Sequence, residues 1–549
     1  MRRRLTAGAV ATATSLAALL VGLPSTPAAA AASTEYTVVA DDGVSAADAI
    51  AAITAAGGTV VSSNTAVGTF KVTSSAGDFK AQAARSAALI GASANKPIGY
   101  APKTAPAIEQ PVADALRGKG PRGVKTPDPL DDKLWGLTMI KADKARKIEK
   151  GERGVTVGVL DTGLDASNPD LAPNFSSKLS RNFAPDLVDV DGPCEVESCL
   201  DPVGTDDGGH GTHVAGTIAA AANGTGLSGV APNVTLVELK GGQDSGYFFL
   251  APVVNALTYA GDAGLDVVNM SFYVDPWLYN CTANPADSPE AQAEQQAIIT
   301  GVKRALNYAH KRGVTLVGAL GNQHDNLNDP QVDTTSPDYG GTPYERPLDN
   351  KTCFSLPAEG PHVIGVSAIG PSTSKSHYSN YGTEQIGVAA PGGFTRDFFG
   401  TPQYNTSANN ILSTYPLAVL QKNGTVDADG NPTSPNVFKE CTADGKCGYY
   451  TYLAGTSMAS PHAAGVAALI VSRYGHRDWW RGGLTLNPKI VESILYRSAT
   501  KTACPEPRLR SYVQEGYSTD FDAYCDGDKN FNSFYGHGIV DAYKAVGGR

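Results

Sequence analysis

Three residues that are far apart in this chain have the side chains needed for nucleophilic catalysis. Ser457 lies in a small-residue turn, and the apolar run at 463–470 predicts a helix directly after it. The serine would then lie near a helix N-terminus, whose free N–H groups and positive dipole end favour a developing oxyanion. Asp161 follows a strand-like run, and His210 opens an Ala-rich helix. Acyl transfer uses such a hydroxyl, imidazole and carboxylate as nucleophile, base and orienting group.

Each of these residues, taken alone, also has an ordinary structural explanation. Ser457 and Asp161 could be helix or turn caps, and His210 a histidine at the start of a helix. Their joint occurrence in the order Asp, His, Ser, each in a glycine-rich context, is what favours a catalytic triad. Asn322 adds a side-chain amide that could donate to the oxyanion, although it could equally be a turn residue.

The elements that must position these residues alternate between strands and helices. Strand-like runs are found at 155–160, 234–239, 266–271, 313–319 and 361–368, with helical stretches at 247–263 and 291–312. This alternation predicts an α/β fold with a parallel, doubly wound sheet that has helices on both faces. Sites in such sheets gather at the carboxyl ends of strands. Asp161, Ser271 and Asn322 all occupy such ends, so we expect them to converge.

Composition and charge narrow the class of protein. The chain has 549 residues, 60 glycines, 18% charged residues and a net charge of −10. These values suit a compact, loop-rich α/β protein better than a coiled coil or a disordered chain. The negative charge argues against nucleic acid as a partner. We expect a monomer, with no membrane anchor after the leader because no later apolar run is long enough to span a bilayer.

The N-terminus has the features of a secretory signal peptide over residues 1–32. Basic residues at 2–4 precede an apolar stretch at 9–23, and small residues at 27–32 fit signal peptidase. A single spanning helix is the alternative, but the stretch is Ala/Thr-rich and leads into an A-x-A-like site. The sequence therefore predicts a secreted, extracellular protein.

All eight cysteines follow residue 190, and an even number in an exported chain predicts disulfides. Close spacing favours Cys194–Cys199 and Cys441–Cys447, which leaves Cys281–Cys353 and Cys504–Cys525 as the working assignment. A zinc site is disfavoured because no CxxC pairs are present. Insertions without regular patterning are expected near 185–207, 273–287, 323–357 and 398–449.

A short unit at 33–103 precedes the large domain, which is expected to span 130–549. Its pattern of strands and helices has the order βαββα and predicts a small, ferredoxin-like α+β sandwich. Residues 104–129, rich in Pro, Gly and basic side chains, predict a linker that is open to proteolysis.

The three segments around the triad residues resemble the signature blocks of the subtilisin-like serine peptidases. These blocks are Asp-Thr-Gly at 161–163, His-Gly-Thr-His at 210–213 and Gly-Thr-Ser-Met-Ala at 455–459, in the family's order. The resemblance implies a serine endopeptidase with Asp161 as orienting carboxylate, His210 as base and acid, and Ser457 as nucleophile. Asn322 matches the family's oxyanion asparagine. His213 and His462 belong to the blocks but look structural.

The resemblance also implies that a peptide substrate binds as an added strand between two edge segments. The implied substrate-binding residues are Gly241, Ser245, Gly246, Ser271, Phe272 and Tyr273. This chain has Tyr273-Val274 where the family usually has two glycines. The departure predicts a narrower or reshaped first pocket, unless the loop simply bends away.

Calcium is the cofactor that the resemblance implies, in a structural and not a catalytic role. Asp170 and Asn223 match two oxygen ligands of the family's tight site, and Asp131 is a third candidate. The alternative is a capped turn without metal. The acidic run at 186–207 is interpreted as a solvated loop rather than a second site, and it could steer basic substrates to the cleft.

The leading unit at 33–103 resembles the family's inhibitory prodomain. This implies a zymogen whose prodomain acts as an intramolecular inhibitor and is cut off in the linker by the enzyme itself. Two alternatives remain at this point: a secreted binding protein that uses the fold as a scaffold, and an esterase. The strand-like substrate edges argue against the esterase.

Overall fold

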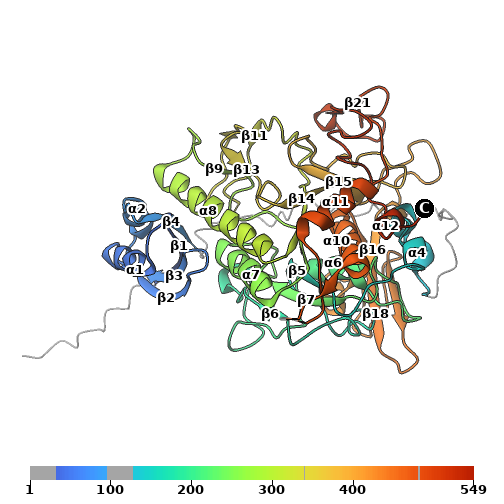
Figure 1. Ribbon diagram of the computed structural model, residues 1–549, viewed down its shortest axis with the longest axis horizontal. Helices are drawn as coiled ribbons and strands as arrows, with labels where there is room; N and C mark the ends of the chain where they lie inside the picture. Colours follow the sequence, from blue (N-terminus) through green and yellow to red (C-terminus); the bar gives the residue numbers. More distant parts are fainter. Residues whose placement is uncertain (1–32, 95–127, 339–340, 480–481) are drawn as a thin grey trace, which may run out of the picture.

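The structure is a computed structural model that describes residues 33–94, 128–338, 341–479 and 482–549 (Figure 1). The signal peptide at 1–32 and most of the linker at 104–129 lie outside the described residues, so both stay predictions. Among the described residues, no helix has both the length and the apolar character required to cross a membrane.

The largest sheet has seven parallel strands in the order β15-β14-β10-β8-β5-β7-β6. The strands are β5 (Thr156–Asp161), β6 (Arg181–Asn182), β7 (Thr235–Lys240), β8 (Val267–Met270), β10 (Thr315–Ala319), β14 (Val363–Ile369) and β15 (Ile386–Pro391). Apart from Thr156 at the start of β5, the central strands β5, β8 and β10 are buried, and their runs are mainly apolar, as expected for a sheet that is covered on both faces.

Helices cover both faces of this sheet. One face packs on α6 (His210–Ala219), α10 (Thr456–Tyr474) and α11 (Pro488–Ser498), and the other on α7 (Leu250–Ala263) and α8 (Pro289–Lys311). Shorter helices are α3 (Trp135–Met139), α4 (Ala142–Ala145), α5 (Val188–Asp191), α9 (Leu417–Lys422) and α12 (Ala542–Ala545). The doubly wound α/β prediction is confirmed.

The N-terminal unit is a four-stranded antiparallel sheet in the order β2-β3-β1-β4 with two helices. Its elements are β1 (Thr34–Ala40), α1 (Ala46–Ala55), β2 (Thr59–Asn64), β3 (Thr69–Ser74), α2 (Phe79–Ala84) and β4 (Leu89–Ala94). The strand β4 is one element more than the sequence predicted, because its small residues carry a weak β signal.

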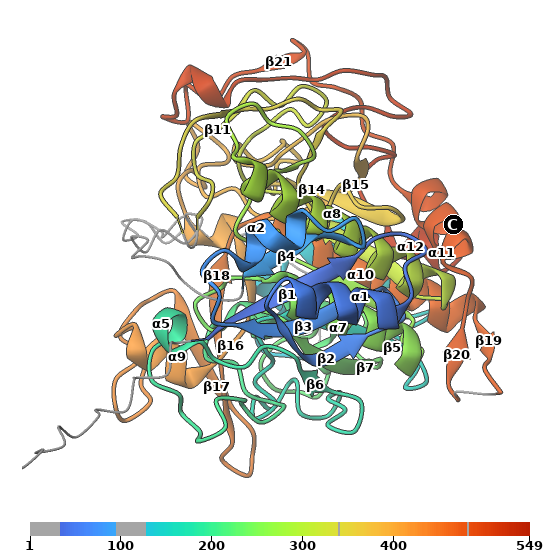
Figure 2. The same cartoon turned by 90° about the vertical axis from the view of Figure 1, so that its left-hand side faces the viewer.

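This unit lies against α7 and α8 (Figures 1 and 2). Arg304 of α8 donates from Nη1 to the carbonyl oxygen of Ala40 at 2.9 Å, and Asn64 Nδ2 donates to Asn255 Oδ1 of α7 at 3.0 Å. Lys80 pairs with Glu294 at 2.8 Å. Val39 and Val67 of this unit also belong to the apolar cluster formed by α7 and α8, so the contact is both polar and apolar.

The four disulfides are the four pairs that the sequence assigned: Cys194–Cys199, Cys281–Cys353, Cys441–Cys447 and Cys504–Cys525. Each closes a segment within or beside a long loop. Covalent closure of this kind limits the motion of loops that have little core of their own.

The insertions are more ordered than their sequences indicated. The segment at 398–449 forms most of a three-stranded antiparallel sheet in the order β16-β18-β17. Its strands are β16 (Ile411–Tyr415), β17 (Val437–Cys441) and β18 (Cys447–Leu453). Here the expectation of patternless structure was wrong, because polar turns interrupt the alternation that marks a strand.

The remaining short strands form four two-stranded pairs. These are β9 (Asn280–Cys281) with β13 (Cys353–Phe354), β11 (Val332–Asp333) with β12 (Arg346–Pro347), β19 (His476–Arg477) with β20 (Leu484–Thr485), and β21 (Leu509–Arg510) with β22 (Ala523–Tyr524).

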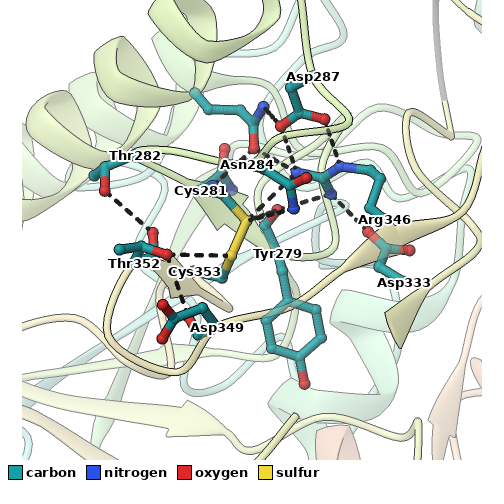
Figure 3. The surroundings of a disulfide bond; sticks show 12 residues. Tyr279, Cys281, Thr282, Asn284, Asp287, Asp333, Arg346, Asp349, Thr352 and Cys353 are labelled. Carbon is teal, nitrogen blue, oxygen red and sulfur yellow. Dashed lines mark hydrogen bonds and ion pairs between the residues drawn. A yellow bond between two sulfur atoms is a disulfide. The ribbon is translucent and has the colours of Figure 1, made fainter. Parts of the chain in front are cut away.

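A buried arginine joins the two middle insertions (Figure 3). Arg346 is fully buried; its Nε lies 2.9 Å from Asp287 Oδ1, and its Nη1 lies 2.8 Å from Asp333 Oδ2. The disulfide Cys281–Cys353 lies beside it. Removing one partner from a buried ion pair leaves an uncompensated charge, so the three charged side chains hold 273–287 and 323–357 in one arrangement.

Candidate active site

The ends of β5 and β8 bring the proposed triad to one place. The two strands are neighbours, and Leu160 pairs with Met270 in their parallel register. Asp161 and Ser271, the next residues along, therefore lie side by side on strands about 4.8 Å apart. Because His210 contacts Asp161 and Ser457 contacts Ser271, the imidazole and the hydroxyl are each anchored at one of two adjacent strand ends.

Asp161 holds the imidazole of His210. The distance from Asp161 Oδ1 to His210 Nδ1 is 2.7 Å, and the same oxygen accepts a hydrogen bond from the Thr162 N–H at 2.9 Å. His210 is the first residue of α6, and it follows Gly209 with φ of +86°. A Cβ at Gly209 would lie 2.6 Å from the ring of Tyr415, so a side chain there would displace the start of the helix.

The charge of Asp161 sets the protonation of His210. Burial alone lowers the pKa of His210, but the charge and hydrogen bond of Asp161, with a smaller effect from Asp206, outweigh it and raise the pKa above its usual value of 6.5. An imidazole held in this way is a stronger proton acceptor than a free one, and its Nε2 is directed away from Asp161.

Asp206 is a supporting residue whose role the sequence did not reveal. It is 3% exposed; its Oδ1 accepts from the Gly209 N–H at 2.8 Å, and its Oδ2 accepts from the Thr212 N–H at 2.8 Å. It thus caps the helix that begins at His210. The interpretation of the acidic run as a solvated loop was wrong here, since Asp186 and Asp201 are buried as well.

Ser457 lies in the first turn of α10. Its hydroxyl donates to the carbonyl oxygen of Ser271 at 3.1 Å and not to the ring of His210. Ser271 Oγ in turn contacts Ser460 Oγ at 2.8 Å and donates to the carbonyl oxygen of Ser457 at 3.2 Å. These bonds fix the backbone at the start of α10 while the side chain of Ser457 can rotate about χ1 between staggered positions. Catalytic hydrogen bonds of substrate-free enzymes often form fully only in the complex.

Asn322 is oriented by the residue that precedes Ser457. Its Oδ1 accepts hydrogen bonds from the Thr456 N–H at 2.9 Å and from Thr456 Oγ1 at 2.8 Å. With the amide oxygen engaged, Nδ2 faces Gly455, where a Cβ would lie 3.5 Å from it. The amide donor is thus held on the side of the Ser457 turn, a geometry that suits an oxyanion donor.

The two further histidines bond to the backbone. His213 Nε2 contacts the carbonyl oxygens of Ile411 and Thr451 at 3.1 and 3.2 Å, and His462 Nδ1 contacts that of Met458 at 2.8 Å. Burial lowers the pKa of His213 to about 3 and that of His462 to about 4. Both are neutral structural residues at physiological pH, as the sequence indicated.

The family model for the subtilase family matches residues 152–538. The chain belongs to the subtilase family. Subtilisin DY of Bacillus licheniformis is 30% identical over 344 residues, which cover 62% of this chain and 85% of that protein. Thermitase of Thermoactinomyces vulgaris is 28% identical over 389 residues, covering 71% and 98%. This subtilase is therefore a serine peptidase that acts on protein or peptide substrates.

Solved structures of other proteins share this fold. The epidermin leader peptide processing serine protease from Staphylococcus aureus has a TM-score of 0.59 at 21% identity, covering 94% of this chain and 98% of that one. Fervidolysin from Fervidobacterium pennivorans has a TM-score of 0.52 at 21% identity, covering 94% and 61%. These likenesses support a subtilisin-like fold for the residues that the structure describes.

The implied substrate edges lie beside the triad. The N–H of Gly241 donates to the carbonyl oxygen of Asp161 at 3.0 Å, and the N–H of Ser245 donates to Asp191 Oδ1 at 3.0 Å. On the other edge, Phe272 stacks on Phe248 with ring centroids 4.0 Å apart. The hydroxyl of Tyr273, expected to reshape the first pocket, is directed to Asp338 Oδ2 at 2.6 Å. The assignment of Gly241, Ser245, Gly246, Ser271, Phe272 and Tyr273 to substrate stays a prediction.

Two of the three predicted calcium ligands lie together. Asn223 Nδ2 lies 3.1 Å from Asp170 Oδ1. Asp131 is engaged elsewhere, since its oxygens accept from the N–H and Oγ of Ser228 at 2.8 and 2.7 Å. Asp128, which the sequence analysis passed over, reaches the same loop through the Gly224 N–H, and its Oδ2 is buried without a hydrogen-bond partner.

The chemistry of this donor set fits a hard cation. Burial, with the charge of Asp131 second, raises the pKa of Asp128 to about 6. Burial also raises the pKa of Asp170 to about 7. Carboxylates and an amide oxygen are the ligands that Ca²⁺ prefers, and a cation would favour the ionised form of both carboxyls.

The protonation of His210 is directly measurable. In the Ser457→Ala protein, used to prevent self-digestion, NMR titration should give His210 a pKa above 6.5. Adding Asp161→Asn should bring that pKa below 6.5, because burial remains while the opposing charge is lost. The exposed Asp262→Asn is the matched control and should leave it unchanged. Equal His210 pKa values with and without the Asp161 charge would contradict this account of the site.

Proposed function

We propose that this subtilase is an endopeptidase that hydrolyses peptide bonds through an acyl-enzyme on Ser457. The observation that carries the proposal is the hydrogen bond between Asp161 and His210 beside the strand end that holds Ser457. This arrangement supports a reaction with His210 as base, the Ser457 hydroxyl as nucleophile and the Asn322 amide as oxyanion donor.

In the proposed reaction, the hydroxyl of Ser457 turns from Ser271 to His210 Nε2, which accepts its proton as the oxygen attacks the scissile carbonyl carbon. Asp161 stabilises the imidazolium that results. Asn322 Nδ2 and the Ser457 N–H donate to the oxyanion. His210 then gives its proton to the leaving amine, and a water molecule repeats the sequence to release the acyl group.

We also propose that the protein is secreted as a monomer and is made as a zymogen. The basic and apolar pattern at 1–32 supports export. The folded unit at 34–94, packed on α7 and α8 and joined to the catalytic domain through 95–127, supports an inhibitory prodomain that is removed by self-cleavage in the linker. Sequencing the N-terminus of the secreted form would locate the cut.

Labelling with an organophosphonate tests the assignment of the nucleophile. The mature protein should bind one equivalent of the reagent and hydrolyse casein, and Ser457→Ala should abolish both. Ser472→Ala is the matched control, because Ser472 lies on the same helix and donates to the Ala468 carbonyl at 2.8 Å. Stoichiometric labelling that persists in Ser457→Ala would refute Ser457 as the nucleophile. No labelling of the mature protein would refute the proposal and favour a scaffold without catalysis.

We propose that Asp170, Asn223 and Asp128 hold a structural calcium ion, which when bound would neutralise two buried carboxylates. Calcium at about 100 times its Kd should then stabilise the Ser457→Ala protein by about 2.7 kcal/mol. Asp170→Asn and Asp128→Asn should lose this response, and Asp131→Asn should keep it. The measurement is thermal unfolding with calcium and with chelator. An unchanged response in Asp128→Asn would refute its role.

A further inference from the structure

Asn322, the proposed oxyanion donor, lies in a turn at 320–325 that is neither helix nor strand. The turn follows β10 and leads into the insertion at 323–357. Its backbone N–H and C=O groups therefore lack the regular partners that a helix or a sheet supplies, and such groups need other partners when they leave water. The position of Asn322 depends on where these partners come from.

One side chain, that of the fully buried Asn380, supplies several of these partners. Its Oδ1 accepts hydrogen bonds from the N–H groups of Gln323 at 3.0 Å and of Asp325 at 2.9 Å. Its Nδ2 donates to the carbonyl oxygen of Leu320 at 3.2 Å and to Gln323 Oε1 at 3.2 Å. An asparagine amide offers two acceptor and two donor positions, so this one is fully used within the turn.

A side chain of the turn extends this link to Asn322 itself. Gln323 Oε1, which accepts from Asn380, also accepts from the Asn322 N–H at 3.0 Å. The Asn380 N–H donates to the carbonyl oxygen of Gly321 at 2.9 Å. The residues directly before and after Asn322 are thus bonded to Asn380, and the N–H of Asn322 is bonded to it through one side chain.

The close approach of Asn380 depends on the glycine before Asn322. Gly321 has φ of +110°, in the left-handed region that favours glycine. A Cβ at this position would lie 2.4 Å from Asn380 Nδ2, which is closer than such atoms can come. The turn therefore has a backbone shape and a missing side chain that both fit the amide of Asn380.

Asn380 belongs to a loop that is itself attached to the large sheet. The loop follows β14, the neighbour of β10 in the sheet. Ser379 Oγ accepts a hydrogen bond from the Ala368 N–H of β14 at 3.0 Å, and the His324 N–H donates to the carbonyl oxygen of Tyr378 at 2.8 Å. The turn is therefore fixed to the strand beside its own.

We propose that Asn380 is a positioning residue, which through the turn at 320–325 holds the Asn322 amide where the oxyanion forms. This rests on the proposed peptidase function and on the role proposed there for Asn322. Thr456 orients the side chain of Asn322, and Asn380 holds the main chain around it. An oxyanion donor acts when charge develops in the transition state, so its displacement slows the chemical step more than it weakens substrate binding.

The first test is a double-mutant cycle on the hydrolysis of a peptide anilide. Asn380→Ala should lower kcat on the order of 10²-fold, the general cost of displacing a reacting group by about 1 Å, and should change KM less than about twofold. In the Asn322→Ala background, the same change should lower kcat less than about threefold, because the donor that Asn380 positions is already absent.

The matched control is Asn174→Ala, at a buried asparagine near the start of β7, away from the carboxyl ends of the strands. Asn174 is 1% exposed, and its Nδ2 donates to the carbonyl oxygens of Ala219 at 2.7 Å and Pro232 at 2.9 Å. This variant should lower the unfolding midpoint, because two buried carbonyls lose a donor, and should keep the wild-type kcat.

Asn380→Asp is a second variant of nearly the same shape. It keeps an acceptor oxygen toward Gln323 and Asp325 but replaces the donor that faces the carbonyl oxygen of Leu320. It should also lower kcat and leave KM nearly unchanged. Thermal unfolding of each variant identifies the folded protein on which the kinetics are measured.

Hydrogen exchange tests the geometry without any change at Asn380. In the Ser457→Ala protein, the N–H groups of Gln323 and Asp325 lie in a loop but donate to a buried amide oxygen. They should therefore exchange far more slowly than the same N–H groups in an unstructured peptide.

Three results would overturn the positioning role of Asn380. These are an equal fall in kcat in both backgrounds, a loss that lies in KM, and unprotected Gln323 and Asp325 N–H groups in folded protein. A wild-type kcat in Asn322→Ala would refute the role of Asn322 and that of Asn380 with it, while the peptidase function stands. Absence of peptide hydrolysis by the wild type would refute the peptidase function itself, and both roles with it.

Discussion

The hydrogen bond between Asp161 and His210 is the contact on which the rest of the site depends. It joins the end of a buried strand to the first residue of a helix that lies 49 positions further on. A fully buried carboxylate needs a partner, and the imidazole supplies one while gaining a raised pKa. One interaction therefore gives Asp161 Oδ1 a partner, fixes the ring and makes it a better base.

The strand order of the sheet places other residues of the site next to this contact. β5, β8 and β10 are neighbours, and their carboxyl ends lead to Asp161, Ser271 and Asn322. Ser457 arrives from much later in the chain, and Ser271 and Asn322 hold the turn around it through hydrogen bonds. The surrounding loops are then closed by four disulfides and by the buried Arg346 cluster, which allows long insertions to border a site that needs fixed distances.

Features of the fold and site that depend on local sequence pattern were predicted correctly. Features that depend on burial by segments distant in the sequence were missed. The order of the five predicted strands of the large sheet, the family and all four disulfide pairs were confirmed. Apolar periodicity and motif order are visible along the chain, and close cysteine spacing indicated two of the pairs and left the other two. Asp206 was taken for a solvated residue because its helix-capping role exists only after folding.

The crystal structure of the organophosphonate adduct would test the central claim most directly. The account predicts phosphorus bonded to Ser457 Oγ, the phosphonyl oxygen about 3 Å from Asn322 Nδ2, and His210 Nε2 within hydrogen-bond reach of the former hydroxyl. The bond between Asp161 and His210 should remain as it is here. An adduct on another residue, or a His210 ring that stays out of reach of Ser457, would contradict it.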